Sequence, residues 1–121
     1  MSDVLSSPTV AFDASAVSSL TGHDDDVQFA LDFVARFRRL LPGRVSRIEQ
    51  AMLGDDYKEA MDAVLSLRTS SCTLGAEELC AVSTRIEECL RAADLSGARV
   101  AARGLAEAEH RADEAFASFL A

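Results

Sequence analysis

Apolar residues recur every three or four positions along most of the chain, the spacing that places them on one face of an α-helix. The widest stripe lies in residues 24–41, and further helices are expected over 42–53, 56–73 and 77–93 and from the turn at 94–97 to the C-terminus. A short helix is expected from Asp13 to about Leu20. No segment alternates with the period of two that a β-strand requires. The apolar positions of the first stripe are Phe29, Phe33, Val34, Phe37, Leu40 and Leu41.

Prolines, glycines and capping residues divide these stripes. Pro42 is expected to end or kink the helix that precedes it and to sit in the first turn of the next one. Gly54 and Asp55 form a C-cap and N-cap pair, Gly75 breaks the following helix, and Ser96 is a capping candidate in the turn before the last helix.

Together these elements predict an all-α fold. Long amphipathic helices joined by short loops form an up-and-down antiparallel four-helix bundle, here with one or two short N-terminal helices. We expect residues 1–11 to be a flexible leader and residues 12–121 to be the bundle.

Composition and charge narrow the function. The chain has 121 residues, which is one domain, and a formal net charge of −8, which disfavours nucleic acid as a partner. The first residues lack a basic and an apolar region and no stretch of about eighteen apolar residues occurs, so we expect neither a secretory signal nor a membrane span. The three cysteines, Cys72, Cys80 and Cys89, are expected to be reduced thiols of a cytoplasmic protein.

One stretch carries more specific information. Residues 64–76 read Val-Leu-Ser-Leu-Arg-Thr-Ser-Ser-Cys-Thr-Leu-Gly-Ala. This segment resembles the signature of histidine phosphotransfer (HPt) domains, in which Ala-His-x-Leu-Lys-Gly-Ser-Ser is followed by Leu-Gly-Ala and the next helix. The resemblance extends over residues 12–120 and implies a bacterial two-component phosphorelay.

Two departures from the signature decide what the resemblance implies here. Leu65 occupies the position of the phospho-accepting histidine, and Thr69 occupies the position of a glycine that leaves room for a receiver domain. A leucine side chain has no lone pair with which to attack an aspartyl phosphate. The chain is therefore expected to be a degenerate HPt domain, not an enzyme, that needs no cofactor or metal.

A helical wheel places Leu65 on a partly exposed flank of its helix, whereas Val64 lies at the centre of the buried side. By resemblance, this flank would bind a response-regulator receiver domain or a histidine kinase module without carrying phosphate. Arg68 stands where the family has a lysine, and Glu77 and Glu78 lie near the rim. The expected docking residues are Lys58, Asp62, Leu65, Arg68, Thr69 and Cys72, and the expected buried residues are Tyr57, Ala60, Met61, Val64, Leu67 and Ser71.

Two other functions stay open at this point. His23 or His110 could serve as an unconventional phosphoryl acceptor. Alternatively, the bundle could be a helical dimerisation or scaffold module unrelated to a phosphorelay, in which case a homodimer is expected. A cluster of arginines at positions 36, 38, 39, 44 and 47 could steer an acidic partner toward the bundle, or could simply be a solvated helix face.

Overall fold

The computed structural model describes residues 11–16 and 27–121. Within these ranges the regular structure consists of helices, and no residue lies in a strand. Residues 14–16 form one helical turn. The helices that follow are α2 (Val27–Leu53), α3 (Tyr57–Leu74), α4 (Glu77–Arg91), α5 (Leu95–Ala102) and α6 (Leu105–Leu120).

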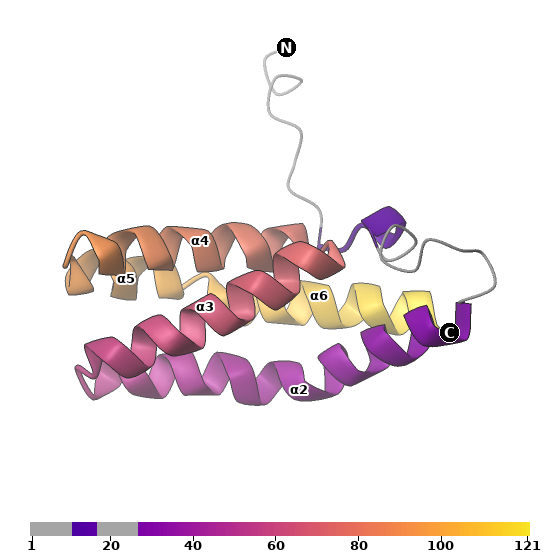
Figure 1. Cartoon of the computed structure of the whole chain (residues 1–121), viewed down its shortest axis with the longest axis horizontal. Coiled ribbons are helices and arrows are strands. Elements are labelled where there is room, and N and C mark those ends of the chain that lie inside the picture. Colours follow the sequence, from indigo (N-terminus) through magenta and orange to yellow (C-terminus); the bar gives the residue numbers. More distant parts are fainter. Residues whose placement is uncertain (1–10, 17–26) are drawn as a thin grey trace, which may run out of the picture.

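The helices run up and down in sequence order (Figure 1). Helices α2, α3 and α4 alternate in direction, and α5 and α6 together supply the fourth antiparallel member of the bundle. The predicted all-α four-helix bundle is therefore confirmed. The start of α2 expected at residues 24–26, the end of the N-terminal helix near residue 20 and most of the expected leader lie outside the described residues.

The core is built from the apolar stripes of all four members. Its largest fully buried side chain is Phe116 of α6, whose ring meets the ring of Phe37 on α2 edge-to-face at 5.6 Å between centroids. Such edge-to-face pairs stabilise a core beyond the area that they bury. The other large and fully buried side chains are Val34, Leu41, Ile48, Val64, Leu67, Leu74, Leu79, Ile86, Leu90 and Leu105.

Of the two outcomes expected at Pro42, a kink or the end of the helix, the end is wrong, and no new helix begins there. Helix α2 is 27 residues long and includes Pro42 in its interior, although its ribbon bends near the middle (Figure 1). A proline inside a helix removes one backbone hydrogen bond and costs about 3 kcal/mol. Buried Phe37, Leu41, Val45 and Ile48 continue the apolar stripe across the proline, and their packing outweighs that loss.

The cap between α2 and α3 lies one residue later than predicted. Asp56 is the N-cap of α3, and its carboxylate accepts a hydrogen bond of 3.1 Å from the backbone N–H of Glu59. Asp55 instead adopts a left-handed backbone conformation (φ 55°), and its carboxylate contacts the guanidinium of Arg99 on α5. Aspartate tolerates this conformation better than most residues, which suits it to the turn.

The expected last helix is divided in two. Asp94, not Ser96, caps the N-terminus of α5, through a 2.8 Å hydrogen bond from the N–H of Gly97. Between α5 and α6, Arg103 donates to the carbonyl of Val100 at 3.1 Å and Gly104 to that of residue 101 at 3.2 Å. These bonds span three residues instead of four, so the helix tightens and ends before it restarts.

The segment of residues 11–16 is bound to the turn between α3 and α4. The backbone N–H of Asp13 donates to the carbonyl of Gly75 at 2.7 Å. The Phe12 ring packs edge-to-face against Phe116 at 5.0 Å and against Phe119 at 5.2 Å. This segment therefore closes one end of the core.

Several large apolar residues are exposed, among them Phe29 and Tyr57, which the sequence assigned to buried stripes. Phe29 is 55% exposed, Leu53 78%, Tyr57 40% and Val100 57%. Among the described helices, none has the length and apolar character needed to cross a membrane.

Candidate functional site

Helix α3 presents one side to the core and the other to solvent. Its buried side consists of Ala60, Ala63, Val64, Leu67, Ser71 and Leu74, close to the predicted stripe except that Tyr57 is exposed and Met61 half-buried. The helix ends at Gly75, whose left-handed conformation (φ 90°) lets its N–H bond to the carbonyl of Ser71 at 3.1 Å. The outer flank of α3 is therefore held rigidly between two defined caps.

The predicted docking residues form a strip along this outer flank. Lys58, Asp62 and Thr69 are exposed, and Leu65 is half-buried, as the helical wheel indicated. At 1.5 Å per residue, the strip from Lys58 to Cys72 is about 21 Å long. We refer to Lys58, Asp62, Leu65 and Thr69 as the Leu65 face.

Arg68 is less free than the sequence suggested. Its guanidinium Nε lies 3.2 Å from a carboxylate oxygen of Glu87 on α4, and the second oxygen of Glu87 binds the Nε of Arg91 at 2.7 Å. Glu87 is 8% exposed, so one buried carboxylate is shared by two cations. The buried Arg68 Nε has no well-aligned hydrogen bond, so the contact is a plain ion pair. Arg68 therefore turns toward α4 and borders the Leu65 face.

Cys72 contradicts the expectation of reduced thiols. It forms a disulfide with Cys80 of α4, and the two Cα atoms are 4.9 Å apart. The tight turn at Gly75 brings the end of α3 beside the start of α4, so two cysteines eight positions apart in sequence can meet. Cys89 is free and half-buried. Cys72 is thus exposed at the end of the Leu65 face, but not as a thiol.

Reduction of this disulfide is expected to lower the free energy of unfolding by about 2.5 kcal/mol, because the bridge closes a loop of roughly eight residues in the unfolded chain. The measurement is urea denaturation with and without reductant. The Cys89→Ser variant is the matched control, since its response should equal that of the parent chain. Equal unfolding midpoints in both conditions would show that the bridge adds no stability.

Glu77 and Glu78, which were expected near the rim of the docking face, differ in their surroundings. Glu77 is exposed, whereas Glu78 forms hydrogen bonds of 2.9 and 3.0 Å with Nε of Arg111 on α6. Glu78 is therefore committed to the α4–α6 contact and not to the Leu65 face.

The arginine cluster is partly neutralised by contacts that no local sequence pattern reveals. Arg38 binds Asp113 of α6 at 2.7 Å, and Arg47 binds Glu59 of α3 at 2.5 Å. These guanidinium groups hold the pKa of the Asp113 carboxyl and that of the Glu59 carboxyl below their usual values. Arg44 donates to the hydroxyl of Ser70 at 3.0 Å. The partners lie 75, 12 and 26 residues away, so only the fold reveals them.

The side chains of the Leu65 face define the groups that it can offer to a partner. Along this part of α3 the side chains are those of lysine, aspartate, leucine and threonine, and no imidazole is present. His110 lies on α6, is exposed, and has its Nε2 3.5 Å from Glu114; His23 lies outside the described residues. Among the described residues, no three histidine, cysteine or carboxylate side chains gather where they could hold a metal ion.

Comparison with known proteins now gives the family. The family model named Hpt domain matches residues 32–115, which include α3 and its turn into α4. The chain belongs to the Hpt domain family. Hpt domains are phosphotransfer modules of phosphorelays, and they carry phosphoryl groups instead of acting as classical enzymes. The resemblance to HPt domains that residues 64–76 indicated is thereby confirmed at the level of the family.

A solved structure supports the same fold. The chain resembles the crystal structure of the HPT domain from a sensor hybrid histidine kinase of Shewanella, with a TM-score of 0.77. The match covers 91% of this chain and 93% of the other at 17% sequence identity, so the likeness concerns the fold. No curated protein matched the chain.

Proposed function

We propose that residues 12–121 form a pseudo-HPt module that binds a receiver domain or a histidine kinase module and carries no phosphoryl group. The observation that supports this most is the half-buried, outward-facing Leu65 on a helix whose caps and core are intact. A partner could still dock on the retained surface, but the nucleophile for phosphoryl transfer is absent. The module would act as a decoy, brake or scaffold in a bacterial cytoplasm.

The Leu65 face suits a protein contact. A partly exposed leucine lies among a lysine, an aspartate and a threonine, so an apolar centre is surrounded by polar groups. Stable interfaces generally combine an apolar centre with a polar rim. Replacing histidine by leucine makes the centre more apolar, and apolar burial contributes roughly 25 cal/mol per Å².

Leu65→Asp is expected to weaken receiver binding at least about tenfold, because docking would bury an unpaired carboxylate against an apolar contact. Binding is measured by calorimetry against each receiver domain of the source genome, phosphorylated and unphosphorylated. Reductant is added in a parallel series because Cys72 borders the face. Intact mass reports any phosphoryl adduct.

Two variants make this test specific. Leu53→Asp introduces the same change at a leucine that is 78% exposed at the far end of α2, and it should bind as the parent does. Thr69→Lys alters an exposed residue of the Leu65 face without touching the core, and it should also weaken binding. Receiver binding that survives both Leu65→Asp and Thr69→Lys would place the docking surface elsewhere.

The same titration tests the alternative that the chain is an active phosphotransfer protein with an unconventional acceptor. If His110 accepts a phosphoryl group, an acid-labile adduct forms and disappears in His110→Ala, and His23→Ala tests the other histidine. The third possibility, a scaffold module, requires a concentration-dependent dimer that hides Leu65 together with no receiver binding.

A further inference from the structure

The Cys72–Cys80 bridge joins two residues of different accessibility. Cys72 is exposed in the last turn of α3, whereas Cys80 is half-buried in the first turn of α4. A thiolate that attacks a disulfide must approach one of its two sulfurs, so access helps to decide which sulfur reacts. The structure therefore favours attack on the Sγ of Cys72.

Buried contacts and backbone hydrogen bonds hold the turn between α3 and α4 independently of the bridge. Leu74, Ala76 and Leu79 are fully buried, and the N–H of Ala76 donates to the carbonyl of Ser71 at 2.9 Å. The bridge spans only eight positions of the sequence, and closing a short loop restricts the unfolded chain less than closing a long one. Opening the bridge is therefore expected to leave α3 and α4 in place.

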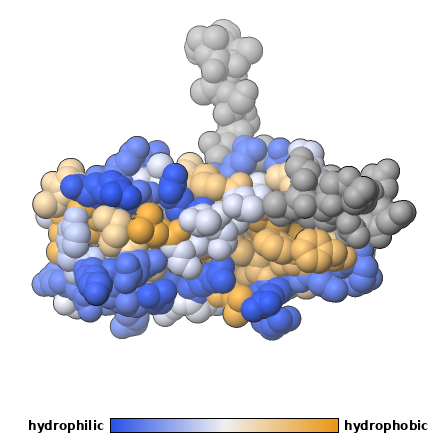
Figure 2. Space-filling model, viewed as in Figure 1, coloured by the Kyte–Doolittle hydropathy of each residue, from blue (hydrophilic) through white to orange (hydrophobic). Residues whose placement is uncertain are grey.

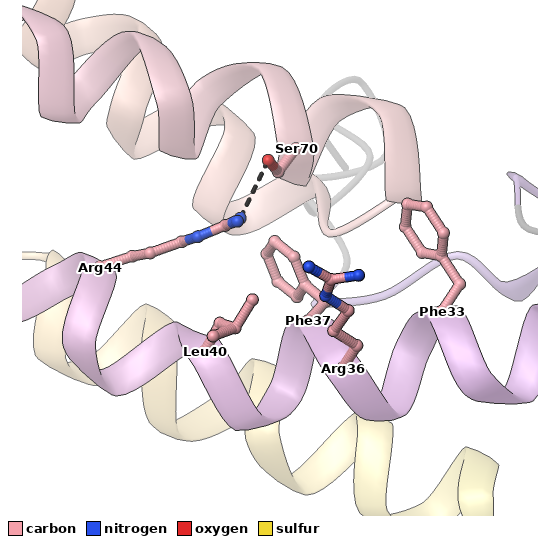
Figure 3. A pocket seen from close by; sticks show the side chains of 6 residues that line it. All are labelled: Phe33, Arg36, Phe37, Leu40, Arg44 and Ser70. Carbon is pink, nitrogen blue, oxygen red and sulfur yellow. Dashed lines mark hydrogen bonds between the residues drawn. The ribbon is translucent and has the colours of Figure 1, made fainter.

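The end of α3 is also anchored to α2, on the side away from the bridge. Figure 3 shows Arg44 of α2 and Ser70 pointing toward each other, and Arg44 donates to the Ser70 hydroxyl at 3.0 Å. Ser70 and Cys72 lie about 160° apart around the helix axis, since each residue turns the helix by about 100°. This anchor does not involve the bridge, so the oxidised and the reduced chain should both be folded, as a reversible redox site requires.

The two cysteines remain within reach of each other when the bridge opens. Their Cα atoms are 4.9 Å apart, inside the range that disulfides commonly span. A cysteine held beside an oxidised neighbour can attack it and restore a disulfide, as the resolving cysteines of redox sensors do. Cys80 is placed to act in this way on Cys72.

Cys72 faces the same direction as Leu65. The two residues are seven positions apart, which is about 20° around the helix axis and about 10.5 Å along it. Thr69 lies between them, one turn before Cys72. A group bonded to Cys72 would therefore lie over the end of the Leu65 face.

The surface around Cys72 suits an anionic thiol, although the chain has a net charge of −8. Residues 65–74 contain no carboxylate and one cation, Arg68, whose side chain is 42% exposed. Figure 2 shows a mostly pale surface over the C-terminal half of α3, neither strongly hydrophilic nor strongly apolar. Small thiols such as glutathione carry carboxylates, which no side chain of this segment repels.

We propose that Cys72 and Cys80 form a reversible thiol-exchange site that a low-molecular-weight thiol opens at Cys72. The entering thiolate bonds to the Sγ of Cys72, the bond between the two cysteines breaks, and its electron pair leaves with Cys80 as a thiolate. Attack by Cys80 on this mixed disulfide restores the bridge and releases the small thiol. Attack by a second small thiol instead releases a small-molecule disulfide and leaves two cysteine thiols, so two thiols are oxidised as the bridge is reduced.

The mixed disulfide also bears on partner binding. The small thiol bonded to Cys72 would cover part of the Leu65 face and block a receiver domain there. This blocking role rests on the proposed pseudo-HPt function, whereas the exchange chemistry does not. The ratio of thiol to disulfide in the surroundings would then control receiver binding.

The exchange is tested on the full chain in glutathione buffers of increasing thiol-to-disulfide ratio, quenched with acid and read by intact mass. The bridge is expected to open and close reversibly within this series, and circular dichroism should show the same helical content in both forms. A bridge that stays closed at every ratio, or a loss of helix when it opens, would identify a purely structural disulfide and overturn the proposal.

Two variants, each combined with Cys89→Ser, identify the sulfur that reacts. Cys80→Ser leaves Cys72 as the single cysteine, and Cys72→Ser leaves Cys80. Oxidised glutathione should modify Cys72 at least about tenfold faster than Cys80, because Cys72 is exposed and Cys80 is half-buried. Equal rates, or a faster reaction of Cys80, would contradict entry at Cys72.

Calorimetry with a receiver domain measures the effect of the adduct. The glutathione adduct of Cys80→Ser should bind at least about tenfold more weakly than the same variant after reductant has removed the adduct. Unchanged binding would overturn the blocking role. If no receiver binds any form of the chain, the pseudo-HPt proposal fails, while the mass measurements still decide whether the exchange site exists.

A matched control places the same adduct elsewhere. Leu53→Cys, combined with Cys72→Ser, Cys80→Ser and Cys89→Ser, carries glutathione at a position of α2 that is 78% exposed and lies outside the Leu65 face. Its adduct should leave receiver binding unchanged. An equal loss of binding in this variant would show that glutathione acts without covering the Leu65 face, and would contradict the blocking role.

Discussion

Leu65→His, combined with Thr69→Gly, is expected to let the Leu65 face accept a phosphoryl group from a receiver domain. The imidazole nitrogen would attack the phosphorus of a receiver's aspartyl phosphate in line, forming an N–P bond while the P–O bond to the aspartyl carboxylate breaks. Position 65 is half-buried on the outer flank of α3, where an imidazole would reach the surface. Removing the Thr69 side chain gives the receiver room one helical turn away.

The measurement is the intact mass of each variant after mixing with phosphorylated receivers. We compare Leu65→His alone, the double variant and Leu65→Gln. Glutamine has a side chain of similar reach to histidine but is a poor nucleophile, so Leu65→Gln should remain unmodified. Leu53→His adds a histidine at an exposed site outside α3 and should remain unmodified. If the double variant is not phosphorylated by receivers that the parent binds, the Leu65 face does not present position 65 to the phosphoryl group.

Phe116→Ala is expected to lower the free energy of unfolding by about 3–5 kcal/mol, the usual cost of deleting a buried aromatic side chain. Phe116 is 0% exposed and touches the rings of Phe12 and Phe37 edge-to-face. Its loss would leave a cavity where α2, α6 and the N-terminal segment meet. The free energy of unfolding of a single domain is commonly about 5–15 kcal/mol, so this substitution removes a large share of the stability.

The matched control is Phe29→Ala, which deletes the same side chain from a site that is 55% exposed. Urea denaturation should show a change of less than about 0.5 kcal/mol for this variant. A loss below about 1 kcal/mol for Phe116→Ala would mean that the three rings do not hold the helices together as their geometry indicates.

The sequence predicted correctly those features that depend on the residues of a single helix. The positions of Val64 and Leu65 on opposite sides of the core boundary follow from a period of 3.6 residues, and α3 shows both. The stop at Gly75 follows from the freedom of glycine to adopt a positive φ. Both predictions depend only on neighbours along the chain.

The predictions were wrong or incomplete for features that depend on contacts between distant parts of the chain. Pro42 should interrupt a helix locally, yet packing of Leu41 and Val45 against the rest of the bundle carries α2 through it. The Cys72–Cys80 bridge depends on the angle between two helices, which spacing alone does not give. The partners of Arg68 and Glu78 lie on other helices, so the sequence could not show that these side chains are already occupied.

The turn between α3 and α4 shows that part of the family signature is required by the fold itself. A side-chain carbon added at Gly75 would lie 2.6 Å from the carbonyl oxygen of Asp13 and 2.7 Å from the Cβ of Ala16, and Leu74 and Ala76 are fully buried. Selection for a stable bundle alone would therefore preserve Leu-Gly-Ala, whether or not phosphate is ever transferred. Position 65 is half-buried on the outer flank of α3 and takes no part in this turn, so the proposed loss of a histidine there would leave the turn intact.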